Sequence, residues 1–367
     1  MKRCFLLSFA LLALGAACAG GGNDEPLTVT VGVVQSTSGA AAIYGKSTVK
    51  GIELAIKQSH SDELHIEFKV IDDQSTVEGG KAAFTTLVGQ KVDAIIGPTL
   101  TGVALEAQKI SQAATIPTLS ATTTGEGITA TGDYVFRIAL SEEKVVPPTL
   151  AYVNQQSPIK QAVLILDSSD AFSRSSAAAM RQGLQGINAT AMLEIDAANG
   201  ADYAGALARI RNANFDAFLI TPLVDLSGPI VRTLRNQGFT QPVVGGNSFN
   251  TLEMVANSGG AVGGAYVGAS WNPGLSAAMS QKFVTDYTAA YGAAPDLYAA
   301  QGYASVQVLV AAMKKAGTAE PGQLRAAIAG LSNLDTVFGK VSMSDKREAL
   351  YQPVVQQFRD GKLVVVQ

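Results

Sequence analysis

Short β-rich apolar runs alternate with helical segments along most of this chain, and no other feature constrains its fold as strongly. Strands that are joined through helices run parallel, with right-handed crossovers between them. The expected strands of a first set are 27–34, 66–71, 94–96, 116–119 and 134–138, and those of a second set are 162–166, 191–195, 217–220, 242–244 and 265–267. The two sets predict an α/β protein with two doubly wound parallel-sheet lobes.

Helical segments separate these strands. Their expected ranges are 45–58, 78–88, 102–114, 149–155, 174–184, 203–211 and 227–236. The segment 149–155 is expected to begin only after the helix breakers Pro147 and Pro148. Two long helices, at 275–291 and 298–316, have no strand between them, so we expect them to return and cover the first lobe. The expected elements at the end of the chain are a helix at 321–331 and strands at 339–342 and 352–366, around Gly361.

The division into lobes follows from this order of elements. The chain of 367 residues is longer than one ordinary hydrophobic core requires, so two domains are expected. We expect lobe I to comprise residues 27–146 and 270–345, and lobe II residues 147–269 and 346–367. The chain would then cross between the lobes three times. Each lobe is expected to bind ligand at the carboxyl ends of its strands.

The first 26 residues resemble an export signal. Lys2 and Arg3 precede an apolar run at 5–14, which is too short to span a bilayer stably. Small residues and then Cys18 follow, as in a bacterial lipoprotein signal, although Gly15 stands where that signal usually has Leu. Residues 1–17 are therefore predicted as a signal peptide and 18–26 as a flexible tether. Ordinary secretion, with cleavage after a small-x-small sequence, is the alternative.

Cysteine usage supports the lipoprotein interpretation. The chain has two Cys, Cys4 and Cys18, and both lie in the leader. No disulfide is therefore expected after the tether, and Cys18 is best explained as a lipidation site. The sequence predicts a protein in the periplasm or at the cell surface that is held to the membrane by a lipid anchor.

Charge and chemistry exclude several classes of function. A formal net charge of −3 gives no electrostatic footprint for nucleic acid. Residues 40–47 fit the spacing of a phosphate loop, but side chains stand where a phosphate loop needs glycines. The two His lie in a polar turn, and no metal-site spacing or G-x-S-x-G elbow occurs. We therefore expect no enzyme activity, no cofactor and no metal.

Hydroxyl side chains cluster after two neighbouring strands. Thr99 and Thr101 lie between a strand and a helix, and residues 120–124 follow the next strand. Both clusters lie at strand carboxyl ends, where hydroxyls and helix amides could hold a carboxylate in one cleft. Tyr44 and Phe172 occupy corresponding loops of the two halves, where their aromatic faces could enclose an apolar ligand.

The order of several segments resembles a known family. VGVVQSTSGAAAIYGKSTVKGIELAI is followed by VIDDQS and then by AIIGPTLTGVALEAQKISQAATIPTLSATTT. This series is similar to the type I periplasmic binding proteins, and most of all to the leucine/isoleucine/valine-binding subfamily of ABC importers. The likeness continues through residues 166–172, 203–207, 243–247 and 302–307, and it covers about residues 27 to 360. It rests on the order and spacing of the segments, because no single motif is specific.

The resemblance implies ligand-binding roles for particular residues. Tyr44 falls where the family places an aromatic ring against the ligand side chain, and Thr101 falls on its carboxylate-binding hydroxyl. Phe172 matches a second-lobe Tyr, without the hydroxyl. The segment that binds carboxylate and ammonium in the family corresponds to Thr122, Thr123 and Thr124.

Two departures from the family bear on the ligand. Asn247 stands where amino-acid binders place an acidic residue for the ligand ammonium, and an amide cannot neutralise a buried cation. Asp225 is the candidate to take over that role, although it could equally cap a helix. The family's first-lobe disulfide is also absent, since Ser75 and Leu100 occupy the matching places. An aliphatic amino acid, an amide and an aromatic acid all remain possible ligands.

The resemblance implies a two-lobed clamp with a three-crossing hinge. Its function would be to capture a small polar or amphipathic solute between the lobes and to present it to an inner-membrane ABC permease. One alternative is a ligand sensor or envelope regulatory lipoprotein on the same fold. A weaker alternative is an envelope hydrolase, for which no nucleophile, base and acid can be named.

Overall fold

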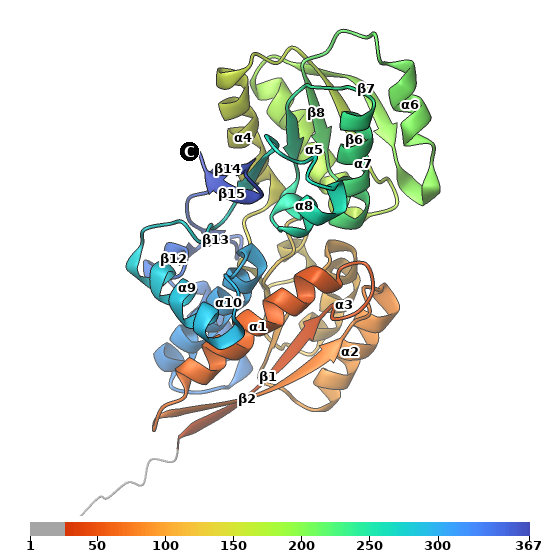
Figure 1. Ribbon diagram of the computed structural model, residues 1–367. Helices are drawn as coiled ribbons and strands as arrows, with labels where there is room; N and C mark the ends of the chain where they lie inside the picture. The colour runs from red at the N-terminus through yellow and green to blue at the C-terminus, as the bar shows by residue number, and fades with distance from the viewer. Residues whose placement is uncertain (1–25) are drawn as a thin grey trace, which may run out of the picture.

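The computed structural model describes residues 26–367. The predicted signal peptide and Cys18 lie outside this part of the chain. Two α/β lobes lie one above the other, with the first strands and helices in the lower lobe of Figure 1 and residues 161–245 in the upper lobe. The C-terminus lies beside the upper lobe, near the junction between the two.

Lobe I is built on a five-stranded parallel sheet in the order β2-β1-β3-β4-β5. Strand β1, which lies between β2 and β3, is buried on both faces from Val31 to its end, as an inner strand of a parallel sheet requires. Val31 and Val33 pack toward helices α1 and α10 (Leu297–Ala316), whereas Val34 packs toward α2 and α3. The bounds are β1 Leu27–Gln35, β2 Leu64–Asp72, β3 Ala94–Ile96, β4 Thr118–Ser120, β5 Val135–Arg137, α1 Ala42–Ser59, α2 Val77–Gly89 and α3 Thr101–Ala113.

Lobe II is built on a seven-stranded sheet in the order β15-β14-β10-β9-β8-β6-β7. Its parallel strands are β6 Gln161–Leu166, β7 Thr190–Asp196, β8 Ala217–Ile220, β9 Val243–Gly245 and β10 Tyr266–Ala269. The hairpin of β14 Val354–Arg359 and β15 Lys362–Val365 adds an antiparallel edge through a turn at Asp360 and Gly361, whose φ values of 49° and 72° suit a tight hairpin. The helices are α4 Glu142–Gln156, α5 Ala171–Gly186, α6 Tyr203–Arg209, α7 Val224–Asn236 and α8 Glu253–Ser258.

Helix α4 begins seven residues earlier than the sequence predicts. The prediction that it starts only at 149 is wrong, because Pro147 and Pro148 lie inside the helix. A proline removes a hydrogen bond to the carbonyl four residues earlier. Those carbonyls belong to Glu143 and Lys144, which are exposed, so water can satisfy them. The apolar side of the helix, including Val145 and Val146, is buried in lobe II.

The segment after β10 returns to lobe I. Helices α9 Ala278–Tyr291 and α10 Leu297–Ala316 share one hydrophobic core with β1 and α1, which confirms that they cover the first lobe. Helix α11 Pro321–Ala329 and a three-stranded antiparallel sheet follow. This sheet consists of β11 Leu334–Thr336, β12 Gly339–Met343 and β13 Ala349–Leu350. Strands β11 and β13 were not predicted, because two or three residues carry no readable alternation.

The chain passes between the two large sheets three times: after β5, after β10 and after β13. The predicted class, two doubly wound lobes joined by a three-crossing hinge, is therefore confirmed. The predicted lobe limits, 27–146 with 270–345 and 147–269 with 346–367, stay a prediction.

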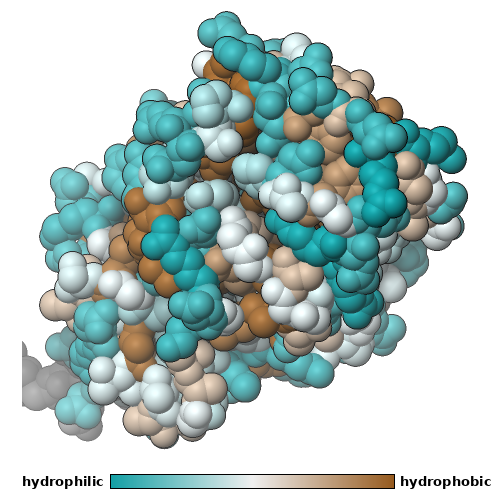
Figure 2. Space-filling model, turned by 45° about the horizontal axis from the view of Figure 1, so that its top comes forward, coloured by the Kyte–Doolittle hydropathy of each residue, from teal (hydrophilic) through white to brown (hydrophobic). Residues whose placement is uncertain are grey.

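Hydrophilic and apolar side chains are unevenly distributed over one face of the molecule (Figure 2). On the face shown in Figure 2, teal side chains form most of the rim, and brown side chains gather in separate patches between them. Within residues 26–367, no helix is long and apolar enough to cross a membrane.

Candidate functional site

A narrow cleft between the lobes lies where strand ends and helix N-termini of both lobes meet. From lobe I it is lined at the starts of α1, α3 and α10 and by the segment after β4, and from lobe II at the starts of α5 and α7 and by the segment after β9. Its volume is about 30 Å³, room for about two waters, since one water needs about 10–15 Å³ by this measure. A larger solute therefore needs the lobes to separate before it enters. The lining residues are Tyr44, Thr99, Leu100, Thr101, Thr122, Thr124, Phe172, Leu223, Asn247, Ser248 and Tyr298.

Six of the eight residues predicted for the ligand site lie together in this cleft, and they come from both lobes. They are Tyr44, Thr101, Thr122, Thr124, Phe172 and Asn247. Thr123 is buried but does not line the cleft. Asp225 is exposed in the first turn of α7, also outside the cleft lining. The fold thus brings most of the predicted set together, and their roles toward a ligand stay predictions.

Sequence reasoning missed several members of the cleft wall. Leu100 and Leu223 are apolar residues directly before helices α3 and α7, a place where a polar cap is the usual expectation. A leucine in place of a polar cap is the sequence feature that could have indicated a helix N-terminus facing a ligand. Tyr298 lies near the start of α10, a helix that the sequence assigned only to covering lobe I. Its place in the cleft depends on the return of the chain, which local pattern does not show.

Two tyrosines of lobe I reach across to lobe II. The rings of Tyr44 and Tyr298 lie 4.7 Å apart between centroids, tilted by 47°. The Tyr44 hydroxyl accepts a hydrogen bond from the backbone N–H of Val224 at 2.9 Å. The Tyr298 hydroxyl donates to the carbonyl oxygen of Asn247 at 2.9 Å. Burial raises the pKa of both tyrosines, so they bridge the lobes as neutral phenols.

Helices α1, α3 and α7 begin at the cleft without a side-chain cap. Helices α5 and α10 are capped by Asp170 and Asp296, whose carboxylates accept backbone N–H bonds. No side chain caps α3 or α7. The first N–H of α7 is satisfied by Tyr44, whereas α3 turns its N-terminal amides and its dipole toward the cleft. This end of α3 favours an anionic group.

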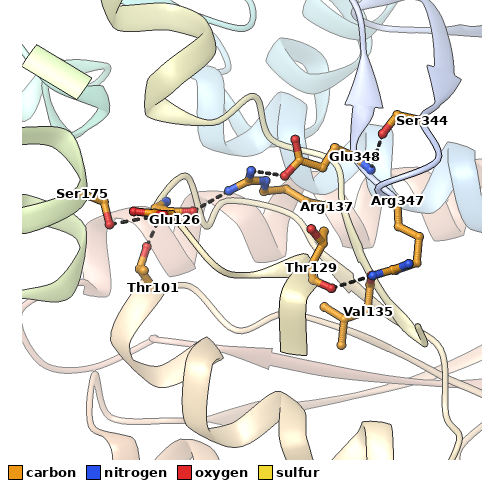
Figure 3. A network of polar contacts seen from close by, with 10 residues as sticks. Thr101, Glu126, Thr129, Val135, Arg137, Ser175, Ser344, Arg347 and Glu348 are labelled. Atoms are coloured by element: carbon orange, nitrogen blue, oxygen red, sulfur yellow. Dashed lines mark hydrogen bonds and ion pairs between the residues drawn. The ribbon is translucent and has the colours of Figure 1, made fainter. Parts of the chain in front are cut away.

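A polar network holds the loop beside Thr101 (Figure 3). The Thr101 hydroxyl oxygen accepts from the backbone N–H of Gly125 at 3.3 Å, which leaves the hydroxyl proton available to a solute. Arg137 donates to the carbonyl of Gly125 and pairs with Glu348. In lobe II, the Ser175 hydroxyl accepts from the N–H of Glu126 at 3.1 Å. The loop at 125–126 therefore contacts both lobes.

Glu142 is a buried carboxyl group directly behind the cleft wall. Its side-chain Oε2 accepts from the Ser176 hydroxyl at 2.7 Å and from the Asn247 N–H at 3.4 Å. Its Oε1 has no hydrogen-bond partner among residues 26–367. Burial raises the pKa of Glu142. The residue lines a separate polar cavity of about 130 Å³. No pattern in the sequence marks Glu142 as buried.

None of the residues that line the cleft between the lobes carries a formal charge. Hydroxyls, one amide and aromatic or aliphatic side chains make up its wall, which suits a small amphipathic molecule. Within the described part of the chain, no cluster of three potential metal ligands occurs.

Comparison with known proteins gives a consistent result. A family model described as "Periplasmic binding protein" matches residues 28–360. The Leu/Ile/Val-binding protein BraC3 of Rhizobium johnstonii is 22% identical over 348 residues, which are 92% of this chain and 94% of that protein.

Solved structures agree with this match. The branched-chain amino acid binding protein LivJ of Streptococcus pneumoniae, in complex with isoleucine, superposes with a TM-score of 0.85 at 25% identity, covering 92% of this chain and 99% of that one. A solute-binding protein from R. palustris, in complex with benzoate, has a TM-score of 0.83 at 23% identity, covering 92% and 95%. The same fold therefore holds ligands of different chemistry.

Proposed function

Because the chain belongs to the periplasmic binding protein family, we propose that it is the extracytoplasmic solute-binding protein of an ABC importer. Its solute would be a small polar or amphipathic molecule, such as a branched-chain amino acid, an amide or a related acid. The family consists of solute-binding proteins of the periplasm, and no chemical change of the solute is part of the proposal.

The observation that carries the proposal is the composition of the cleft. Helix starts of both lobes supply its wall, and the tyrosines of lobe I hydrogen-bond to lobe II across it. A solute held there contacts both lobes, so its binding energy can stabilise one closed arrangement of the hinge. We infer that Thr101, Thr122 and Thr124 hold its polar end and that Tyr44 and Phe172 pack its body.

A thermal-shift screen against a library of amino acids, amides and aromatic acids tests solute binding. A solute at about 100 times its dissociation constant stabilises the folded state by about 2.7 kcal/mol. Calorimetry should then give one site per chain. The recovered solute should be unchanged by NMR after prolonged incubation, and turnover would contradict a purely binding role.

We further propose that the protein is anchored by lipid at Cys18 and delivers its solute to an inner-membrane permease. The position of Cys18 between an apolar run and a polar tether supports the anchor. Labelling with a radioactive fatty acid should mark the wild type and Cys4→Ala but not Cys18→Ala. A mature protein that begins downstream of Cys18 without lipid would contradict the anchor. Solute uptake that fails on deletion of the gene would support the transport role over a sensor.

A further inference from the structure

A chain of buried amide side chains connects the cleft to the hinge. Asn272 follows the second crossing between the lobes, and its Nδ2 donates to Gln356 Oε1 at 2.5 Å. The Gln356 amide donates in turn to Asn250 Oδ1. Asn250 Nδ2 donates to Oδ1 of Asn247, a residue of the cleft wall, at 2.9 Å. All four side chains are at most 6% exposed.

Backbone groups fix the direction of two of these amides, those of Asn272 and Asn250. Asn272 Nδ2 also donates to the carbonyl of Leu363 at 3.1 Å, and its Oδ1 accepts from the N–H of Gly274 at 2.7 Å. Asn250 Nδ2 also donates to the carbonyl of Gly268 at 2.9 Å. A carbonyl oxygen can only accept and an N–H can only donate, so neither amide can be turned around without losing these bonds.

The direction of the hydrogen bonds along these four amides determines which end of the Asn247 side chain meets the solute. Oδ1 of Asn247 is held by Asn250, and the backbone N–H and carbonyl of Asn247 bond to Glu142 and Tyr298. Its Nδ2 has no partner among residues 26–367 and is the group left for the cleft. At this position the wall therefore presents a hydrogen-bond donor.

Two groups on the facing side of the cleft, the Thr101 hydroxyl and the first amides of α3, are donors as well, whereas the Thr122 hydroxyl gives its proton to the carbonyl of Thr99 at 3.0 Å. The Thr101 hydroxyl accepts from Gly125 and keeps its proton for a solute, and the first amides of α3 lack a side-chain cap. No lining residue carries a negative charge. A ligand ammonium would need acceptors and a counter-charge at this place.

We infer that Asn247 is a specificity-determining residue that directs its amide Nδ2 at an acceptor of the solute, and that the cleft selects a carboxylate or other acceptor-bearing solute without an ammonium group. Asn250, Gln356 and Asn272 are positioning residues that hold the amide of Asn247 in this direction. The inference rests on the proposed solute-binding function and names the class of its solute.

Glu142 is the acidic residue that contacts Asn247 directly and could oppose this selection. Its carboxyl group lies behind Asn247, where Oε2 is already bonded to Ser176 and to the Asn247 backbone. The Glu142 side chain faces the separate cavity of about 130 Å³. The other charged residues that line this cavity are Arg137, Glu126, Glu143 and Glu348. Glu142 is not part of the cleft wall, so a solute in the cleft meets the amide of Asn247 instead.

The direction of the amide can be measured without any solute. In the isotope-labelled protein, the side-chain NH2 signal of Asn247 is identified by its loss in Asn247→Asp. Its protons should show Overhauser contacts to cleft residues such as Thr101 and Phe172. Contacts of both protons to Asn250 instead, with none to the cleft, would overturn the inference.

Matched probes then test the selection. L-leucine and 4-methylpentanoate share a carbon skeleton and differ in the ammonium group, and so do L-phenylalanine and 3-phenylpropanoate. Calorimetry should show tighter binding of the member without the ammonium, by tenfold or more. Asn247→Asp keeps the acceptor for Asn250 and turns a carboxylate toward the cleft. This variant should weaken the binding of the probe without an ammonium group by about ten- to hundredfold, so that the amino acid of each pair binds more tightly.

Further variants separate position from fold. Asn212→Asp adds the same charge at an exposed site of lobe II and should change nothing. In Asn250→Asp, the side chain of residue 250 can no longer donate to Asn247, so Asn247 can turn its oxygen to the cleft. The preference for the probe without an ammonium group should then shrink, although residue 250 touches no solute. Asn247→Leu removes the donor without adding charge. It should weaken the binding of carboxylates without allowing amino acids to bind more tightly. This variant replaces the charged variants if they fail to fold.

The outcomes distinguish this inference from the proposed function. Tighter binding of the amino acid of each pair, or an unchanged preference in both Asn247→Asp and Asn247→Leu, would overturn the inference and leave solute binding intact. If no library member binds but the NMR contacts show the Asn247 amide directed at the cleft, the result would count against the proposed function. The direction assigned to the Asn247 amide would still hold.

Discussion

Glu142 and Thr101 show how single residues near the cleft are divided between holding the protein together and meeting a solute. Both are almost fully buried. Glu142 leaves one carboxyl oxygen without a partner in the described chain, at a cost that a buried polar atom always carries. Thr101 accepts one backbone hydrogen bond and retains one proton. Each residue leads to a prediction that a substitution of that one side chain can test.

For Glu142 the prediction concerns the pH dependence of stability. Because burial raises its pKa, the folded protein holds the proton at pH values at which the unfolded chain has released it. The free energy of unfolding therefore falls as the pH rises from the unfolded pKa, about 4.5, through the raised folded value. Glu142→Gln cannot ionise and keeps an acceptor for Ser176, so its stability relative to the wild type should rise over this interval.

Urea unfolding between pH 4 and pH 8 at constant ionic strength measures this difference. Glu143→Gln is the matched control, since that neighbouring side chain is exposed. A difference between Glu142→Gln and the wild type that stays constant with pH would show that the carboxyl group does not titrate in this way.

For Thr101 the prediction concerns affinity. Thr101→Val keeps the shape but removes the hydroxyl, which leaves a solute oxygen and the Gly125 N–H unpaired. We expect a loss of about 1–3 kcal/mol in the binding free energy, or roughly ten- to hundredfold in affinity by calorimetry. Thr86→Val, which loses only an exposed hydroxyl bond within α2, should bind as the wild type does. Unchanged affinity in Thr101→Val would place the polar end of the solute elsewhere.

At the scale of elements, most of the fold could be predicted because strands and helices leave a local pattern. The alternation of buried runs and helices is sufficient for both large sheets. The aromatic and hydroxyl residues after the strands locate five members of the cleft wall, and the family resemblance adds Asn247. What could not be predicted depends on contacts made at a distance. Helix α4 includes two prolines because its other side is buried, and Tyr298 joins the cleft because α10 returns to lobe I.

The direction of the Asn247 amide is a further example of that limit. The sequence shows an amide where the family has an acid, but whether its oxygen or its nitrogen meets the solute depends on Asn250, Gln356 and Asn272. These residues come from three separate segments, and only the folded chain brings them into one line.

The contact between α1 and α10 gives a prediction at this scale. A Cβ on Gly51 would lie 1.9 Å from the carbonyl oxygen of Ala299, and one on Gly302 would lie 2.2 Å from that of Thr48. The two helices thus approach backbone to backbone through a glycine on each. Gly51→Ala should destabilise the protein by about 1–3 kcal/mol, although Ala is the better helix former.

Urea unfolding checks the effect against Gly186→Ala in α5. Nothing lies within 4 Å of the added Cβ there, so that change should be neutral or stabilise by up to about 1 kcal/mol. Equal effects at both positions would mean that the close approach of α1 and α10 does not constrain the fold.

At the scale of the whole molecule, the two lobes are held together by a few polar bonds around a narrow cleft. Tyr44 and Tyr298 bond from lobe I to backbone groups of lobe II, and Ser175 bonds from lobe II to the loop at 125–126 of lobe I. Because the cleft measures only about 30 Å³, these bonds must open before a solute enters and form again around it. The balance between open and closed arrangements therefore sets part of the apparent affinity.

Removing the hydroxyl of Tyr44 should shift that balance toward the open arrangement. In Tyr44→Phe, the N–H of Val224 stays buried without its partner when the lobes close, whereas water can satisfy it when they open. The cost of about 1–3 kcal/mol falls on the closed arrangement alone and corresponds to roughly a ten- to hundredfold change in the ratio of the two. Small-angle X-ray scattering of the solute-free protein should then give a larger radius of gyration. Tyr291→Phe loses a comparable bond to the Lys50 carbonyl within lobe I and should not change that radius, so an equal response of both variants would mean that the Tyr44 bond does not govern closure.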